Sequence, residues 1–452
     1  MTYRNAPIHP ILRLIYALLR FTSWVGMSVF YRRRLVLGRE HLRFDGPAIV
    51  VSNHPSTLMD PLNVGISIRQ EMFFLANYSL FKNRVSNWIL SRLFCIPVKR
   101  KEDVEEGEAR DNDAAFEMSF RHLEKNGLLF VAAEGVSWMN RFVRPFKTGT
   151  ARIAFGAERR NDWNLGVKII PVGLSYDAPN LFRSRMTVEY GAPIDPRLWA
   201  AADADNHEKA VDDFTAEIEK RVRMLTLDAG SVEGEAFLNQ VELLIGHAAW
   251  FDSEREGYFF LKNFLAKNLD NEGLKTRTAH YTAALQKAGL TDAGLSSAQK
   301  IKRGAPSPIV HSSSFIVLSR IVHSSSFIVL LVGYGFWFLP CWLPWLLAKR
   351  LKLYVGYDSN VKMLAGLFTF PLALWGGWEL AFWLFGSSLL AWAALAALAA
   401  LGYFAEWYLD KARLWRECRA ARFFQKENPA EWEKLCAKRA EIMRQINRLD
   451  AG

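Results

Sequence analysis

The stretch AIVVSNHPSTLMDPL, residues 48–62, decides how the first half of the chain folds. Its apolar start predicts a buried strand that ends just before His54. Asp60 follows six residues later, and six residues of helix turn through about 600°, which would put the two side chains on different faces. We therefore expect His54 in the loop after the strand and Asp60 in the first turn of a following helix.

Similar short apolar runs recur along the first 200 residues and predict further buried strands. With the first, these runs are 48–52, 73–76, 95–98, 128–132 and 167–172. Helical stretches are expected between them at 112–125 and 149–159, and an amphipathic helix at 206–225 is expected to close the domain. Strands that alternate with helices predict a layered α/β fold.

Charge and cysteine content narrow the class of protein. The chain has 452 residues and a net charge of +11, which suits an anionic lipid surface or phosphorylated substrates. It shows no zinc-finger spacing, basic zipper or aromatic RNA-binding signature, so no nucleic-acid partner is expected. The four cysteines form no CxxC pair and predict neither a zinc site nor a disulfide framework; they are Cys95, Cys341, Cys418 and Cys436.

The apolar segment at residues 11–30 is interrupted by Arg13 and Arg20, which lie near one face of a helix because they are seven residues apart. We expect this helix to lie in the membrane interface, with the arginines extended to lipid phosphates. A membrane span is the alternative, although two arginines make it costly.

Three apolar runs near the C-terminus predict an integral membrane protein. Residues 363–385 and 387–404 have the length of a membrane-crossing hairpin. Basic residues flank the hairpin on both sides, which favours the cytoplasmic face for its flanks and for the catalytic domain. The run at 327–348, which contains two prolines, is then expected to be re-entrant or itself a hairpin. The string IVHSSSFIVL occurs at 309–318 and again at 321–330, and two copies are too few to indicate a solenoid.

His54 and Asp60 suit proton transfer from a hydroxyl. Histidine titrates near neutrality, and a carboxylate that accepts from the other ring nitrogen fixes its tautomer. A substrate hydroxyl can then attack a thioester without a serine or cysteine nucleophile. The spacing alone also fits a structural histidine.

The string Ser52–Leu62 resembles the signature of the glycerol-phosphate acyltransferase superfamily, in which Asn-His, a short spacer and Asp form the catalytic dyad. The five residues between His54 and Asp60 are similar to the spacer of the fungal glycerol-3-phosphate and dihydroxyacetone-phosphate acyltransferases and their bacterial relatives. The lead-in at 36–47 is also similar. The resemblance implies His54 as general base and Asp60 as its orienting carboxylate.

Further motifs of this family follow in order, over residues 34–196. Pro97-Val98-Lys99-Arg100 resembles the second motif, whose arginine meets the acceptor's phosphate. Ala133–Ser137 resembles the third, with alanines at 132 and 133 where the family usually has Phe-Pro. The substrate-binding residues that the resemblance implies are Arg100, Glu134, Gly135, Ser137, Lys147 and, as acyl-pocket wall, Pro171. Arg183 and Arg185 are either phosphate contacts or a basic rim that faces lipid.

The resemblance implies an enzyme that moves a fatty acyl group from acyl-CoA or acyl carrier protein to a hydroxyl of glycerol 3-phosphate in phospholipid synthesis. Lysophosphatidate is the alternative acceptor, and other lysophospholipids come third. Membrane lipids are expected partners, and no metal or bound organic cofactor is implied. A non-catalytic lipid-binding protein is a further alternative, and a transporter is disfavoured because there are too few spans and no inverted repeat.

The predicted fold is an α/β, layered glycerol-phosphate acyltransferase-type domain, followed by a helical region and C-terminal transmembrane helices. The predicted parts are a membrane-associated helix at 1–33, the acyltransferase domain at 34–228, a polar helical region at 229–306, a hydrophobic membrane region at 307–409 and a charged helical tail at 410–452.

Overall fold

The computed structural model describes residues 8–90, 94–99, 112–246, 251, 253–302, 313–352 and 355–450. The chain divides into two compact units. The first consists of Met1–Asp228 with Leu351–Met363, and the second of Ala229–Arg350 with Leu364–Gly452. A short segment from late in the sequence therefore belongs to the N-terminal unit.

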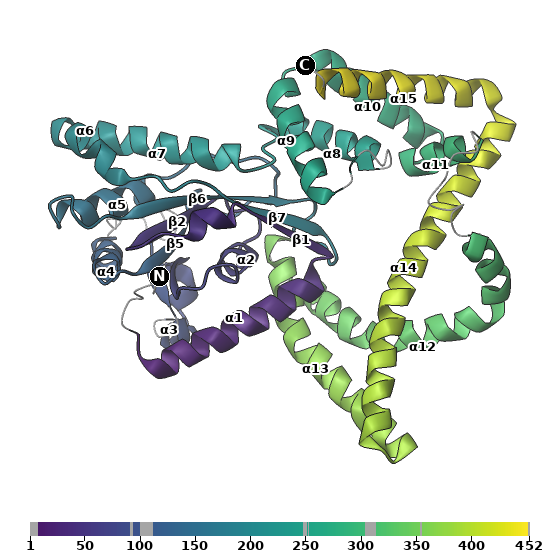
Figure 1. Cartoon of the computed structure of the whole chain (residues 1–452), viewed down its shortest axis with the longest axis horizontal. Coiled ribbons are helices and arrows are strands. Elements are labelled where there is room, and N and C mark those ends of the chain that lie inside the picture. Colours follow the sequence, from purple (N-terminus) through teal and green to yellow (C-terminus); the bar gives the residue numbers. More distant parts are fainter. Residues whose placement is uncertain are drawn as a thin grey trace. The chain divides into compact units, whose positions relative to one another are not determined.

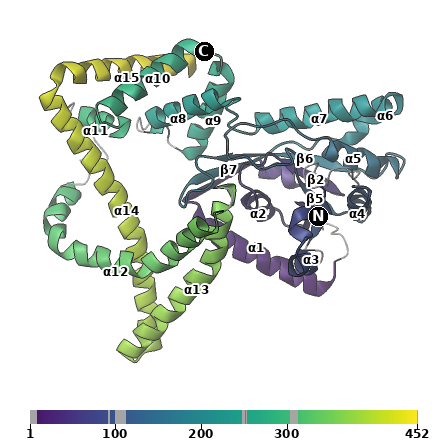
Figure 2. The ribbon, with the colours of Figure 1, turned by 180° about the vertical axis from the view of Figure 1, so that it is seen from behind.

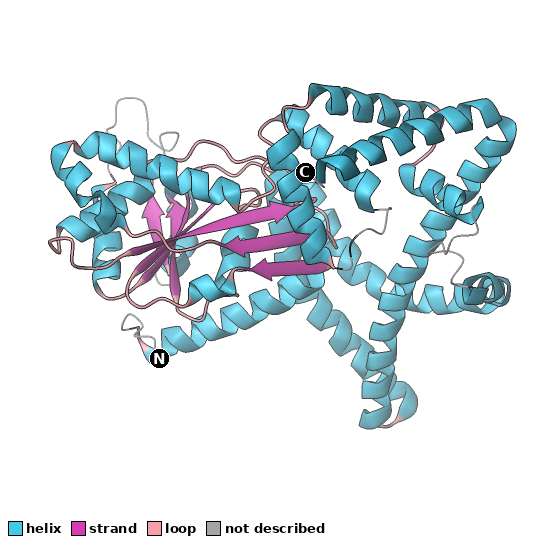
Figure 3. Ribbon diagram, turned by 45° about the horizontal axis from the view of Figure 1, so that its top comes forward, coloured by secondary structure: helices cyan, strands magenta, loops and turns pink. Residues whose placement is uncertain are grey.

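A mixed sheet forms the centre of the first unit. Its strands have the order β1-β7-β6-β2-β5-β3-β4, and Figure 3 shows their strong twist. Their bounds are β1 Arg33–Leu37, β2 Ala48–Ser52, β3 Met72–Asn77, β4 Cys95–Val98, β5 Leu128–Ala132, β6 Lys168–Tyr176 and β7 Arg185–Tyr190. Strands β2 to β6 run parallel to one another, whereas β7 is antiparallel to β6 and pairs in parallel with β1. The five predicted strands are confirmed, and β1 and β7 are additional.

Helices cover both faces of this sheet, which confirms the layered α/β prediction (Figure 1). Side chains of β2 alternate between the two faces: Ile49 and Val51 join one buried cluster, and Ala48 and Val50 join the other. The first cluster contains α4 Asp113–Glu124, α5 Gly149–Arg159 and α7 His207–Met224; the second contains α1 Pro10–Phe30 and α2 Met59–Gly65. The shorter helices of this unit are α3 Arg84–Leu90, α6 Ala200–Asp205 and the 3₁₀ turns η1 Arg39–Leu42, η2 Tyr78–Phe81, η4 Pro196–Trp199 and η5 Val355–Tyr357.

Helix α1 is amphipathic and packs on the sheet domain. Met27 and Phe30 are buried, while an apolar stripe on the other side is exposed: Ile11, Leu14, Leu18, Phe21 and Val25. Both arginines of this helix contact the domain. Nε of Arg13 lies 2.8 Å from Glu71 Oε1, and Arg20 donates to the main-chain carbonyl of Arg69 at 3.2 Å. Their contact with lipid phosphates stays a prediction.

The described part of the second unit is helical. Its helices are α8 Val232–Gly246, α9 Glu254–Asn268, α10 Glu272–Lys287, α11 Asp292–Lys302, α12 Ser313–Leu351, α13 Asp358–Phe385, α14 Ser388–Glu427 and α15 Pro429–Asp450. Helices α8 to α11 pack with α15 and the end of α14 around buried Phe237, Tyr281 and Ile446. Figure 2 shows α14 running without a break from the turn after α13 to α15.

Helices α13 and α14 form the predicted hairpin, which turns at Gly386 and Ser387. Among the described residues these two helices are long and apolar enough to cross a membrane, and their most apolar windows are only 6% and 17% buried. Their exposed apolar side chains, such as Trp383 and Leu389, would otherwise face water.

Helix α12 excludes one of the two predictions for the proline-containing run, that of a hairpin; the re-entrant alternative stays a prediction. It is one helix with Pro340 and Pro344 inside it. Proline at 344 has no N–H to donate to the carbonyl of Pro340, and the hydroxyl of Thr369 in α13 donates to that oxygen instead, at 3.0 Å. The helix continues because a neighbouring helix replaces the missing donor. Of the repeated string, residues 313–318 and 321–330 lie in α12, and 309–312 lie outside the described residues.

Candidate active site

The exit of β2 is fixed by an asparagine. The side chain of Asn53 donates to the carbonyl of Leu174 at 2.9 Å and accepts from the amide of the same residue at 2.8 Å. This two-way bond ties the end of β2 to β6, its parallel neighbour. His54 follows immediately, so its position is set by the sheet.

His54 and Asp60 form the predicted pair. Asp60 lies in the first turn of α2, and its Oδ2 is 2.8 Å from Nδ1 of His54. The carboxylate is fully buried, whereas the histidine side chain is 13% exposed. An ionised carboxylate only accepts hydrogen bonds, so it selects the tautomer with hydrogen on Nδ1. Nε2 is then the basic atom of the ring.

Two further donors hold the Asp60 carboxylate. The amide of Ser56 donates to Oδ2 at 2.7 Å, and the hydroxyl of Tyr176 donates to Oδ1 at 2.7 Å. Burial and the charge of Asp60 raise the pKa of Tyr176 well above its ordinary value, so its hydroxyl keeps the proton that it donates. Three donors therefore hold the buried carboxylate in place: Nδ1 of His54, the Ser56 amide and the Tyr176 hydroxyl.

Hydrogen bonds from Arg34 hold α2, the helix that carries Asp60. Arg34 of β1 donates to the side chain of Asn63 at 3.1 Å and to Ser67 at 2.6 Å. Asn63 is itself 3.4 Å from the hydroxyl of Tyr176. Residues 32–34 are three consecutive arginines, and the last of them, Arg34, thus supports α2.

The predicted Glu134 and Gly135 lie at the end of β5, next to the histidine. Glu134 accepts a 3.2 Å hydrogen bond from the amide of His54. Burial raises the pKa of Glu134 to about 8, against the lowering effect of that hydrogen bond; Asp60 raises it further and Arg144 lowers it. Gly135 has a φ of 75°, in the left-handed region that favours glycine.

The third predicted residue of this motif, Ser137, joins the two loops. Its hydroxyl oxygen accepts from the amide of Thr57 at 2.9 Å, and the amide of the adjacent Trp138 donates to the carbonyl of His54 at 3.1 Å. The loop after β5 therefore contacts the His54 loop on both sides of Pro55.

Arg144 lies at the site but was not among the predicted site residues. Its guanidinium carbon is 4.0 Å from the centre of the Trp138 ring, and its charge lowers the pKa of Glu134. Its Nε is buried and has no hydrogen-bond partner among the described residues. Predicted Lys147 is exposed, and its side chain passes beside Gly135. The string RPFK at 144–147 contained the signal for both cations, but only the lysine was assigned a role.

The remaining predicted residues are not in contact with the dyad in the described structure, or they lie outside the described residues. Arg100 lies outside the described residues. Pro171 is buried within β6 in register with Val51, three residues before His54 along the paired strand. Of the two arginines left open, Arg185 pairs with Asp177 at 3.1 Å.

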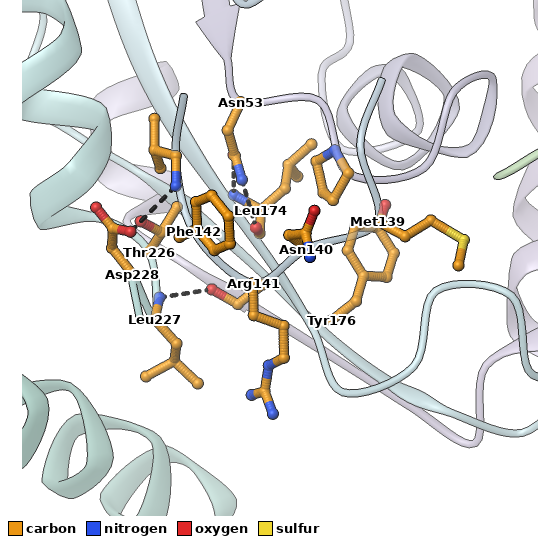
Figure 4. Close-up of a pocket in the computed structure, with 13 residues that line it drawn as sticks. Asn53, Met139, Asn140, Arg141, Phe142, Leu174, Tyr176, Thr226, Leu227 and Asp228 are labelled. Atoms are coloured by element: carbon orange, nitrogen blue, oxygen red, sulfur yellow. Dashed lines mark hydrogen bonds between the residues drawn. The ribbon is translucent and has the colours of Figure 1, made fainter. Parts of the chain in front are cut away.

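A small cleft borders the His54 loop (Figure 4). Asn53 and Pro55 line it from either side of the histidine, opposite the loop at 139–143. Two main-chain amides fix that loop and the residues that follow it. The amide of Val143 donates to Asp228 at 3.0 Å, and the amide of Phe146 donates to Glu219 at 2.8 Å. The cleft therefore has walls that are fixed before any substrate binds.

Comparison with known proteins finds a family match over the residues that contain this site. Residues 33–175 match the family model described as Acyltransferase. The chain carries an acyltransferase domain. The resemblance that the motifs predicted is thereby confirmed for the part of the chain that contains His54, Asp60 and Glu134.

Two curated relatives of this acyltransferase domain come from Saccharomyces cerevisiae. Glycerol-3-phosphate O-acyltransferase 1 is 30% identical over 126 residues, which are 27% of this chain and 16% of the relative. Glycerol-3-phosphate O-acyltransferase 2 is 39% identical over 87 residues, which are 19% of this chain and 12% of the relative. The matched segments thus span less than a fifth of either yeast protein.

One solved structure is similar in part. The 1-acyl-sn-glycerophosphate (LPA) acyltransferase PlsC from Thermotoga maritima aligns with 46% of this chain and 82% of its own, at 19% identity and a TM-score of 0.33.

Proposed function

We propose that this chain transfers a fatty acyl group from acyl-CoA or acyl carrier protein to a hydroxyl of glycerol 3-phosphate. The observation that carries the proposal is the 2.8 Å pair of His54 and Asp60, in which a fully buried carboxylate binds Nδ1 and leaves Nε2 of a partly exposed histidine as the basic nitrogen. The family match over residues 33–175 supports acyl transfer as the reaction.

In the proposed reaction, the acceptor hydroxyl gives its proton to Nε2 of His54 as its oxygen attacks the thioester carbonyl. A C–O bond forms, the C–S bond breaks, and the proton passes from His54 to the leaving thiolate. Asp60 stabilises the imidazolium that exists between these two transfers. General base catalysis of this kind contributes roughly 10²–10⁴-fold in rate.

The acceptor's phosphate would bind the cations beside the dyad. The buried Nε of Arg144 has no partner in the part of the chain that the structure describes, and a phosphate oxygen is a suitable acceptor for it. Lys147 is exposed on the same loop, and Arg100 stays a prediction for the same role. Both yeast relatives are named for glycerol 3-phosphate, which supports this acceptor over lysophosphatidate.

Competition between acceptors tests this choice. Membranes that contain the chain would be given labelled palmitoyl-CoA with glycerol 3-phosphate and lysophosphatidate together. We expect mainly monoacylated product from glycerol 3-phosphate. Product from lysophosphatidate alone would contradict the proposed acceptor, and no product above membranes without the chain would contradict acyl transfer from CoA to either.

We also propose that the α13–α14 hairpin crosses the membrane twice and that the acyltransferase domain lies on the cytoplasmic face. Basic residues before α13 and within α14 support this orientation; they include Lys349, Arg350, Lys411 and Arg413. In a chain without its native cysteines, a membrane-impermeant maleimide should label Gly386→Cys at the turn in intact cells. It should not label Glu272→Cys on α10 until the cells are opened; labelling of both, or of α10 alone, would contradict the orientation.

A further inference from the structure

The segment between α12 and α13 is part of the N-terminal unit, which contains the acyltransferase domain. Residues 351–363 cluster with the N-terminal unit, although they are about 300 positions away in sequence from the His54 loop. The segment contains η5 and the first turn of α13. The remainder of α13 is the first arm of the apolar hairpin.

The contact is centred on Thr57, midway between His54 and Asp60. The hydroxyl of Thr57 donates to the carbonyl of Gly356 at 3.1 Å. Because that bond uses its hydrogen, the hydroxyl oxygen accepts from the amide side chain of Asn360, to which it is hydrogen-bonded. The hydrogen bonds thus run from Asn360 through Thr57 to Gly356.

Other contacts bind the segment on either side of Thr57. The hydroxyl oxygens of Ser56 and Ser359 are 3.3 Å apart, and Ser359 is fully buried. Lys362 donates to the carbonyl of Asn180 at 3.0 Å, and Met363 is buried in the core cluster that contains α2. This segment is therefore built into the domain.

Thr57 needs such support because its backbone is strained. Its φ of 42° lies in the left-handed region, which a β-branched residue rarely adopts. The amide of Thr57 donates to Ser137. Among the described residues, the hydroxyl of Thr57 forms its hydrogen bonds with the 351–363 segment only. If the hydrogen bonds of the Thr57 hydroxyl were lost, the backbone of the loop could relax. The Ser56 amide, which binds Asp60, would then move with it.

We propose that Asn360 is a positioning residue for the His54 loop, and that the root of the membrane hairpin thereby holds the catalytic loop in its active conformation. The inference deepens the proposed function and rests on it for the kinetic effect. Asn360 acts through Thr57 and sets the geometry of the dyad, so its loss should lower kcat and leave the affinity for the acceptor little changed.

The test uses the full-length protein in lipid nanodiscs, four single variants and the double variant Asn360→Ala/Thr57→Val. Asn360→Ala and Thr57→Val remove one hydrogen-bonding partner each, and Thr57→Ser keeps the hydroxyl. Thr369→Val is the matched control, because it removes a hydroxyl from α13 that binds Pro340 and not the His54 loop. Two readouts are taken: kcat and KM for glycerol 3-phosphate, and hydrogen exchange of the peptide that covers 53–60.

We expect Asn360→Ala and Thr57→Val each to lower kcat by about tenfold, the effect of misplacing one catalytic group by a fraction of an ångström. KM should change less than about twofold, and the double variant should be little worse than either single one, because both break the same chain of bonds. Thr57→Ser and Thr369→Val should keep wild-type kcat. Exchange in 53–60 should accelerate in the first two variants only, with β5 as the internal reference for intact folding.

Unchanged exchange in 53–60 in both Asn360→Ala and Thr57→Val would overturn the inference. So would an unchanged kcat, or an effect confined to KM. If the wild-type chain transfers no acyl group, the proposed function fails, and the exchange measurement still decides whether the segment holds the loop. If Asn360→Ala loses the β5 reference, the decision rests on Thr57→Val compared with Thr57→Ser.

Discussion

The hydroxyl of Tyr176 donates a 2.7 Å hydrogen bond to one oxygen of Asp60, while His54 is bound to the other oxygen at 2.8 Å. Both Tyr176 and Asp60 are buried, so water cannot replace either partner. The carboxylate is thus fixed from the side opposite the histidine. Its orientation depends on β6, a strand more than 100 residues further along the chain.

Tyr176→Phe should lower both activity and stability. It leaves Oδ1 of buried Asp60 with one donor fewer, which costs about 1–3 kcal/mol of folding free energy. We expect kcat to fall about tenfold with KM nearly unchanged, since the tyrosine acts through Asp60. Tyr190→Phe is the control, because its buried hydroxyl binds the carbonyl of Val64 and not the dyad. An equal loss of kcat in both variants would show that the effect is one of general stability.

Asp60→Asn should nearly abolish transfer while preserving the fold. An amide that donates to Nδ1 favours the wrong tautomer and cannot stabilise the imidazolium, and the corresponding change in a hydrolase triad costs about 10⁴ in kcat. The chain offers a matched control in Asp203→Asn, since Asp203 binds Nδ1 of His207 at 2.6 Å in a second histidine–aspartate pair. Rates should be measured in membranes with equal amounts of each variant. Wild-type activity in Asp60→Asn would exclude the dyad.

Arg144→Met should weaken binding of a phosphorylated acceptor. A hydrogen bond to a charged group is worth about 1.5–3 kcal/mol, so KM for glycerol 3-phosphate should rise roughly 10–100-fold. With glycerol as acceptor, which has no phosphate, wild type and variant should differ little. Arg185→Met, which removes an exposed arginine that pairs with Asp177, is the control. A loss of activity that is equal for both acceptors would place Arg144 in another role.

Glu134 should make stability fall with rising pH. Burial raises its pKa from the ordinary 4.5 to about 8. Between these values the folded chain keeps a proton that the unfolded chain has lost, so this group's contribution is fully present below pH 4.5 and is lost as pH rises to about 8. The slope for one such group is about −1.4 kcal/mol per pH unit within that window.

Denaturant unfolding at pH 5 and pH 8 should therefore show a smaller drop in unfolding free energy for Glu134→Gln than for wild type. Glu272→Gln changes a glutamate that is 77% exposed and should keep the wild-type difference. An identical pH dependence in wild type and Glu134→Gln would mean that Glu134 ionises normally.

Local patterns were sufficient for the central strands and for the dyad. The strand before His54 and the helix that carries Asp60 follow from apolar runs and helical spacing, and both were found where they were expected. Strand β7 was missed although RMTVEY alternates apolar and polar residues, which is a strand signal. Strand β1 begins with two arginines, so its sequence resembles the basic flank of an apolar helix more than a strand.

Residues that reach the site through tertiary packing could not be predicted from local patterns. The predicted strand at 167–172 stopped short of Tyr176, which the longer β6 brings to Asp60. Asn360 meets Thr57 only because a segment 303 residues later folds back onto the domain. Of the two arrangements predicted for the proline-containing run, the hairpin was wrong because α12 is one helix, in which Thr369 of another helix satisfies the carbonyl that the proline leaves open. Sequence spacing does not encode such contacts.

The most direct measurement is palmitoyl transfer from labelled palmitoyl-CoA to glycerol 3-phosphate by membranes with equal amounts of wild type and His54→Ala. We expect acylated product from the wild type and a rate lower by about 10²–10⁴-fold in the variant, because the acceptor hydroxyl loses its base. Equal rates for the two proteins would contradict the central claim that His54 accepts the proton of the attacking hydroxyl.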